Sequence, residues 1–217
     1  MAGTGNGRRH TREDVALAAL RILDDDGLPE LTMRRLAAAL DVQPSALYWH
    51  FPNKQSLLAD LADRIVAQTR GQQHGGQQDG ADASRTRSEA LALRDALLAY
   101  RDGAEVVSST LALGLGSTAA RDGLAAAITD DGYEAAFAER AATALLHFVI
   151  GQVWHEQQRM QYDSLGVVVP TESLSPLSDR DAAEEFTFGI DLFIDGIQSR
   201  PGEQSAPPRA SEPTVTA

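Results

Sequence analysis

The stretch Thr32-Met-Arg-Arg-Leu-Ala-Ala-Ala-Leu-Asp-Val-Gln-Pro-Ser-Ala-Leu-Tyr-Trp-His50 predicts two short helices joined by a tight turn. Thr32 can cap the first helix, and Pro44 suits the first turn of the second. Ala37 is small enough for two helices to cross closely, and Asp41 tolerates the positive φ that the turn favours. An apolar seam then locks the pair together, and it consists of Leu36, Leu40, Val42 and Leu47.

This pattern leaves polar and aromatic residues on the surface of the second helix. Tyr48 and Trp49 would be unfavourable to expose without a partner, and Arg34 and Lys54 flank them. Such a surface is typical of a recognition helix that faces DNA. The alternative is that residues 47–51 are the core of a small helical domain. The order of cap, small crossing residue, turn, Pro-initiated helix and flanking cations favours DNA binding.

The rest of the chain predicts an all-α protein, because Ala, Leu, Arg, Gln and Glu dominate its periodic segments and no segment alternates as a strand would. We expect a basic N-terminus at 1–10, a helix-turn-helix domain at 11–70 and a linker at 71–84. A second helical domain follows at 85–200, and a disordered tail at 201–217. Helices are predicted at 11–26, 32–40, from Pro44, after Lys54, and at 88–100, 121–129, 133–161 and 179–199.

Composition limits the class of protein. The 217 residues include no cysteine, which excludes disulfides, thiolate metal sites and a cysteine nucleophile. No run approaches the roughly 20 apolar residues that span a bilayer, so we expect a cytoplasmic protein without membrane contact. The net charge of −12 falls entirely on residues 57–217, because residues 1–56 carry seven basic and seven acidic groups. Repulsion from phosphate is therefore concentrated away from the helix-turn-helix.

The segment LTMRRLAAALDVQPSALYWHFPNKQSLL, residues 31–58, resembles the DNA-binding domain of the tetracycline-repressor (TetR) family. The pattern L-Y-x-H-F-x-N-K-x-x-L that begins at Leu47 is that family's hallmark. Three later segments resemble the ligand-binding domain of its tetracycline-binding members: 100–106, 147–153 and 186–197.

The resemblance implies an all-helical homodimer whose N-terminal domains contact adjacent major grooves of a palindromic operator. Pro44 and Ser45 depart from the tetracycline-binding members, so their operator sequence does not carry over. Arg8, Arg9 and Arg12 form a candidate arm that contacts phosphates, although a short basic tail is more often only solvated. The residues that the resemblance places at the DNA are Arg34, Pro44, Ser45, Ala46, Tyr48, Trp49, His50 and Lys54.

The second domain carries two predicted surfaces, one for dimerisation and one for a ligand. A stripe at helical spacing in the last helix is more often core, but the resemblance implies a four-helix bundle between two subunits, with Gly189 and Gly196 allowing close approach. That stripe is Phe186, Ile190, Phe193, Ile194 and Ile197. The candidate ligand-binding residues are Thr110, Arg121, His147, Gln152, Trp154, His155 and Gln157, although a lone histidine such as His147 is commonly a hydrogen-bonded core residue.

A metal site and a cofactor are not expected. In the tetracycline-binding members a histidine ligates drug-bound magnesium, and the matching residue is Val107; the supporting acidic residue matches His155, with Glu156 beside it. We therefore expect a different, largely apolar small-molecule inducer. Enzymatic motifs such as a phosphate loop, G-x-S-x-G or H-E-x-x-H are absent. The open alternatives to a repressor are a ligand-dependent activator of the same fold and a helical interaction protein without DNA binding.

Overall fold

The computed structural model describes residues 10–72, 84–116, 118–166 and 179–200. These residues form nine helices and no strand, which confirms the all-α prediction. The basic residues Arg8 and Arg9, most of the predicted linker and loop, and the tail after residue 200 lie outside the described residues. No helix in the described part of the chain is long and apolar enough to cross a membrane.

Three helices build the N-terminal domain: α1 (Arg12–Asp26), α2 (Met33–Ala39) and α3 (Pro44–Leu47). Thr11 and Asp14 form a capping box at the start of α1. Gly27 follows α1 with φ 87° and ψ 171°, so its φ is positive but its conformation lies outside the left-handed helical region. This extended form is open only to glycine, and it turns the chain toward the C-terminal domain.

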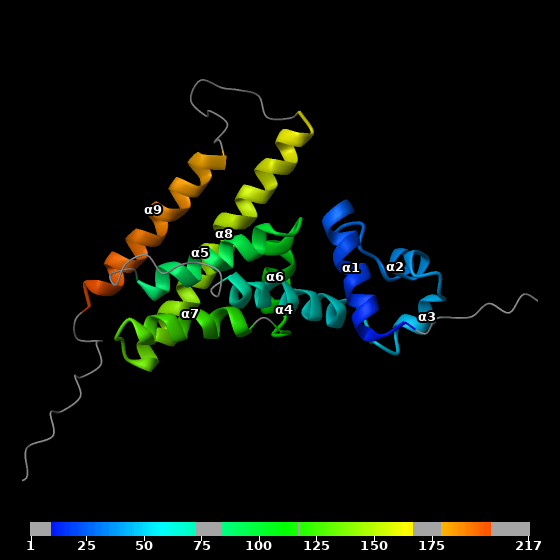
Figure 1. Cartoon of the computed structure of the whole chain (residues 1–217), viewed down its shortest axis with the longest axis horizontal. Coiled ribbons are helices and arrows are strands. Elements are labelled where there is room, and N and C mark those ends of the chain that lie inside the picture. Colours follow the sequence, from blue (N-terminus) through cyan, green and yellow to red (C-terminus); the bar gives the residue numbers. More distant parts are fainter. Residues whose placement is uncertain (1–9, 73–83, 117, 167–178, 201–217) are drawn as a thin grey trace, which may run out of the picture.

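Helix α4 (Lys54–Gln72) joins the two domains. It packs against α1 in the N-terminal domain and against α5 and α6 in the C-terminal domain. In Figure 1 it runs from the blue N-terminal helices into the green body of the molecule. Its last residues, 71 and 72, were predicted as linker, but the helix continues through Gly71 to Gln72.

The C-terminal domain comprises α5 (Arg85–Leu98), α6 (Gly103–Ala112), α7 (Thr118–Asp130), α8 (Ala135–Ser164) and α9 (Asp179–Gln198). Helix α8 is one unbroken helix of 30 residues, and it extends three residues past the predicted helix end at residue 161. Helix α6 was not predicted. Its central residues are β-branched or hydroxylated, types that favour a helix weakly, and burial of Val106 and Val107 stabilises it instead.

Helix α9 contacts both α5 and α8, and it lies beside α8 in Figure 1. Aromatic rings contribute to the contact with α8. The Phe148 ring lies 6.1 Å from Phe186 and 5.1 Å from Phe193, centroid to centroid. A Cβ on Gly189 would lie 2.3 Å from the Phe148 ring, so only glycine allows this approach. Of the stripe that we predicted for dimerisation, Phe186, Ile190 and Ile197 are buried in this chain's own core, and Phe193 and Ile194 are half-buried beside it.

Asp131, just after α7, ties α7 to the start of α5. Its carboxylate accepts hydrogen bonds from the backbone N–H groups of Arg85 and Thr86 and from the hydroxyls of Ser84 and Thr86, at 2.7–3.0 Å. Burial alone would raise the pKa of Asp131, but these hydrogen bonds together outweigh it and lower the pKa. The charged form is therefore the one that stabilises the fold.

We expect Asp131→Asn to lower the free energy of unfolding by about 1–2 kcal/mol at neutral pH, because an amide keeps only one acceptor oxygen. Since the folded-state pKa is lowered, this stabilisation is complete above the ordinary aspartate pKa near 3.8 and is lost as the pH falls through the folded value. Urea unfolding at a series of pH values should show the two proteins converging in acid. Asp130→Asn, which breaks only the exposed pair with Arg85, is the control; an equal loss in both variants would contradict the assignment.

Candidate nucleic-acid interface and ligand cavity

The turn between α2 and α3 has the geometry that the sequence predicted. Asp41 has φ 54°, and its N–H donates to the Ala38 carbonyl at 3.2 Å. The Val42 N–H donates to the Ala37 carbonyl at 3.0 Å, which closes the turn. Ala37 is buried at the helix crossing, and the apolar seam around it is buried or half-buried. The helix-turn-helix interpretation is confirmed at each of these positions.

Helix α3 and the residues after it present one exposed surface. Leu47 and Phe51 are buried, so they hold the helix from below. Trp49 is 91% exposed and Tyr48 is 49% exposed, values that are high for large aromatic side chains in a folded domain. Pro44, Ser45 and Ala46 are also exposed, and His50 is half-buried. The predicted DNA-contacting residues of this segment are therefore at least partly accessible to a partner.

The two arginines of α2 differ in their surroundings. Arg35 donates to Glu30 at 2.7 Å and also pairs with Asp26, so its charge is compensated within the domain. Arg34, the predicted DNA contact, is exposed near the start of the helix. Of these two neighbouring cations, Arg34 is the one whose position suits an external anion.

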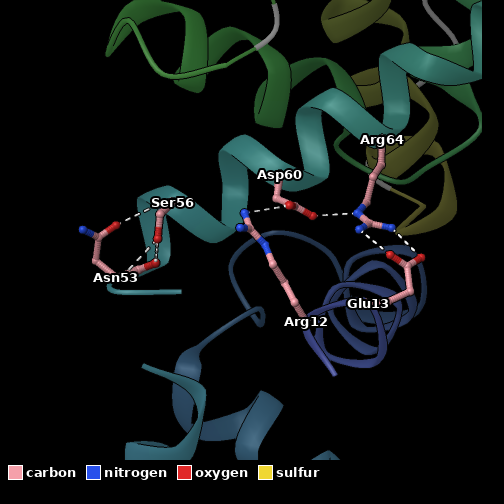
Figure 2. Close-up of polar contacts among 6 residues, drawn as sticks. All are labelled: Arg12, Glu13, Asn53, Ser56, Asp60 and Arg64. Atoms are coloured by element: carbon pink, nitrogen blue, oxygen red, sulfur yellow. Dashed lines mark hydrogen bonds and ion pairs between the residues drawn. The ribbon is translucent and has the colours of Figure 1, made fainter. Parts of the chain in front are cut away.

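The N-terminus of α4 lies just beyond the aromatic surface. The side-chain oxygen of Asn53 accepts the Ser56 N–H at 2.7 Å, and the Ser56 hydroxyl donates to the Asn53 carbonyl at 2.8 Å (Figure 2). Asn53 is thus the N-cap, and Lys54 is the first residue of the helix. A helix N-terminus carries a partial positive charge, so Lys54 adds its ammonium to a site that already attracts anions.

Two arginines and two carboxylates clamp α1 to α4 (Figure 2). Arg12 donates to Asp60 at 2.9 Å, and Arg64 pairs with both Asp60 and Glu13 at 2.6 Å. Hydrogen bonding to Arg64 lowers the pKa of Glu13, and the hydrogen bonds to Glu13 and Asp60 raise the pKa of Arg64. The Arg12 guanidinium also lies 4.7 Å from the centre of the Phe51 ring. This clamp fixes the recognition segment relative to α4.

The turn between α5 and α6 joins the C-terminal domain to α1. The Asp102 carboxylate accepts the Leu28 N–H at 2.8 Å and also accepts a hydrogen bond from the Gln161 amide of α8. The Arg101 N–H donates to the Asp24 carboxylate at 3.3 Å. A Cβ on Gly27 would lie 2.9 Å from the Asp102 carboxylate, so glycine is required for this contact. We call residues 99–102 the joint.

Gln157, which we had predicted to bind ligand, holds this joint from α8. It is buried, its amide donates to the carbonyls of Leu97 and Tyr100 at 3.0 and 2.9 Å, and its carbonyl accepts the Ala104 N–H at 3.2 Å. On the other side, Gln68 of α4 donates to the Tyr100 hydroxyl at 2.8 Å. The joint therefore touches α1, α4 and α8, a connection that no local sequence signal indicated.

A cavity of about 430 Å³ lies between α6, α7 and α8. It brings together Arg121 and His147, two of the predicted ligand-binding residues. Thr110 is buried, and its hydroxyl donates to the Val107 carbonyl at 2.9 Å. The exposed residues Gln152, Trp154 and His155 do not line the cavity. Its lining is Ser108, Leu111, Ala112, Thr118, Arg121, Thr143, Leu146, His147, Ile150 and Gly151.

A second hollow of about 490 Å³ lies between α8 and α9. Its apolar floor includes Phe137, Leu192 and Phe193, and Arg140 and Arg200 also line it. On α9, the side chain of Phe188 is 66% exposed and that of Leu192 is 57% exposed. Sequence reasoning missed these two residues, although their spacing of four places them on one face of α9, opposite the buried stripe. We call Phe188, Leu192 and this hollow the outer α9 face. No group of metal-ligating side chains occurs among the described residues.

Comparison with known families covers both domains. Residues 17–61 match the family described as bacterial regulatory proteins, tetR family. Residues 76–200 match the tetracyclin repressor-like C-terminal domain. The tetracycline repressor protein class A from transposon 1721 of Escherichia coli is 34% identical over 198 residues, which cover 86% of this chain and 89% of that protein. The class C repressor of the same organism is 40% identical over 154 residues, 70% and 68% of the two chains.

Solved structures agree with these sequence matches. Mycobacterium smegmatis BioQ has a TM-score of 0.72 and 38% identity, over 88% of this chain and 98% of its own. BioQ solved with its natural double-stranded DNA operator has a TM-score of 0.67 and 37% identity, over 87% and 98%. A possible TetR family transcriptional regulator of Streptomyces coelicolor A3(2) has a TM-score of 0.69 and 32% identity, over 87% and 99%.

The turn geometry predicts opposite effects for two substitutions of Asp41. Asp41→Val should lower the free energy of unfolding by about 1–2 kcal/mol, because a β-branched residue fits poorly at φ 54°. Asp41→Gly should leave stability unchanged or slightly higher, since glycine adopts this conformation without a Cβ clash. Chemical denaturation of both variants measures the difference. Equal stability of the two variants would show that the turn does not require a positive φ.

Proposed function

Since this chain belongs to the tetR family of bacterial regulatory proteins, we propose that it represses transcription by binding a palindromic operator as a homodimer, from which a small molecule releases it. The observation that carries the proposal is the exposed recognition surface at α3. Trp49 is 91% exposed there, on a chain that is 37% identical to a regulator solved with its operator. A surface of this kind is costly to leave in water unless a partner covers it.

The residues of this surface divide into two roles. Pro44, Ser45 and Ala46 begin the recognition helix, where side chains meet base edges in the major groove. Tyr48, Trp49, His50 and Lys54 flank it and suit the phosphate backbone, as does the N-terminus of α4. Arg34 can reach either a guanine edge or a phosphate. In this division, the first group determines which operator sequence is preferred, and the second group determines the overall affinity for DNA.

Dimerisation is proposed on the outer α9 face, with α8 and α9 of each subunit forming a four-helix bundle. Phe188 and Leu192 supply exposed apolar area, and the hollow between α8 and α9 can receive side chains of a second copy. The predicted residues Phe193 and Ile194 border this face, whereas Phe186, Ile190 and Ile197 support it from within the core. Two copies then present two recognition helices, which must lie about 34–36 Å apart to fill successive major grooves.

Release requires that the ligand bind one domain arrangement better than the other. The cavity lies between α6, α7 and α8, and the joint that begins α6 contacts α1 and α4. A ligand that shifts α6 therefore acts, through the joint, on α1 and α4, the helices that lie before and after the recognition segment in the sequence. We place the inducer in this cavity, with Arg121 and His147 as contacts; the candidates Gln152, Trp154 and His155 lie outside it on the exposed side of α8.

Loss of phosphate contacts should weaken binding to all DNA. We expect Lys54→Ala to lower the affinity for an operator chosen by binding-site selection and for random DNA alike. The slope of log K against log salt should fall by about one unit, because one fewer counterion is released. Fluorescence anisotropy at several salt concentrations measures both quantities. Arg85→Ala is the control, since this exposed cation lies at the start of α5; an unchanged slope for Lys54→Ala would place the DNA surface elsewhere.

A charge on the outer α9 face should separate the subunits. The double variant Phe188→Glu, Leu192→Glu would bury unpaired carboxylates at a self-complementary surface, which is strongly unfavourable. We expect monomers by light scattering and at least tenfold weaker operator binding, since one half-site makes half the contacts. Both side chains are exposed in the single chain, so the fold should survive. Leu113→Glu alters another exposed leucine and should stay dimeric; a dimeric double variant would move the interface.

A further inference from the structure

We infer that the cavity between α6, α7 and α8 binds an amphipathic organic anion, such as a carboxylate or sulfonate attached to an apolar body. This inference rests on the proposed function, because it names the ligand class of the same cavity. Two observations carry it: the residues that line the cavity include cationic and hydrogen-bonding side chains, and they also include several apolar side chains.

The lining of the cavity includes several groups that favour an anion. Arg121 is in the first turn of α7, which begins at Thr118, so its guanidinium adds to the partial positive charge of that helix end. His147 enters from α8, and its ring can donate a hydrogen bond even when it is neutral. The hydroxyls of Ser108 and Thr118 line the same space. Guanidinium donors bind planar or tetrahedral oxyanions with short, charge-assisted hydrogen bonds.

One neighbouring carboxylate competes for Arg121. Asp122 accepts from its guanidinium at 2.9 and 3.3 Å, but this pair joins adjacent residues and both side chains are about half-exposed. An exposed pair of this kind contributes little free energy, so an anion in the cavity can take its place. Asp122 does not line the cavity, and among the described residues no acidic side chain does. In a chain with net charge −12, a lining that contains Arg121 and His147 favours a negatively charged ligand.

The apolar part of the lining limits the ligand to a partly apolar molecule. Leu111, Leu146 and Ile150 line the cavity, and Ile150 is buried. A volume of about 430 Å³ accommodates a molecule of two or three rings or an equivalent chain. The sequence alone had suggested a largely apolar ligand. The cavity adds a single anionic group to that description.

Two fluorescent probes that differ only in charge test this inference on the full chain. 8-Anilinonaphthalene-1-sulfonate carries the anion, and N-phenyl-1-naphthylamine is the same ring system without it. We expect Arg121→Gln to raise the Kd of the sulfonate probe about tenfold, because one charge-assisted contact is lost. The Kd of the neutral probe should change by less than about twofold. His147→Gln should also weaken binding of the sulfonate probe more than binding of the neutral probe. Arg85→Gln, an arginine outside both hollows, is the matched control.

Each other outcome overturns the inference. Equal losses for the two probes in Arg121→Gln would mean that the variant damages the cavity rather than an anion contact. An unchanged Kd in Arg121→Gln, or the main loss in Arg140→Gln, would place the anion outside this cavity, in the second case between α8 and α9. Operator affinity is measured separately without probe. Wild-type chain that binds no selected operator would contradict the proposed function, whereas the probe contrast reports on the cavity alone.

Discussion

A recognition helix of four residues cannot hold its own shape in water, and the rest of the structure supplies what it lacks. Helix nucleation is unfavourable, and a helix of this length therefore depends on tertiary packing. Leu47 and Phe51 are buried beneath α3, Asp41 sets the turn before it, and Arg12 covers the Phe51 ring. These supports come from α3 itself, from the α2–α3 turn and from α1, and α1 is held to α4 by the pairs Arg12–Asp60 and Glu13–Arg64. We therefore expect a motion of α4 to reach the recognition surface through α1.

The same helix α4 is part of both domains, and this gives the joint its importance. Asp102 accepts hydrogen bonds from Leu28 and from Gln161, so one carboxylate links the end of α1 with α8. Gln157 is buried and uses its amide to fix the turn from the other side. Polar groups buried in this way are costly to separate, so the contacts shift together or not at all. We propose that these contacts connect the ligand cavity of the C-terminal domain with the N-terminal domain.

The distribution of charge and apolar area separates the surfaces of the molecule. The acidic excess lies in residues 57–217, while residues 1–56 carry equal numbers of acidic and basic groups. Several carboxylates of the N-terminal domain are held in internal ion pairs such as Arg35–Asp26 and Arg64–Glu13. Arg34 and Lys54 remain near the recognition surface. Helix α9 is apolar on two faces: one is core, and the other, with Phe188 and Leu192, is exposed. A helix apolar on two sides commonly packs against two neighbours.

The sequence by itself determined the helix-turn-helix, because its signals are local. Thr32 caps the first helix, Asp41 forms the turn, Pro44 begins the second helix, and Leu36 and Leu47 supply the apolar seam between the two helices. Local signals also indicated most helices, but not α6, whose β-branched residues are helical only because the core buries them. Only the tertiary structure decided which face of α9 is core, that Gln157 serves the joint, and that Arg121 meets His147 at one cavity. These facts join residues far apart in the chain, and periodicity within one helix cannot tell which neighbour its face will meet.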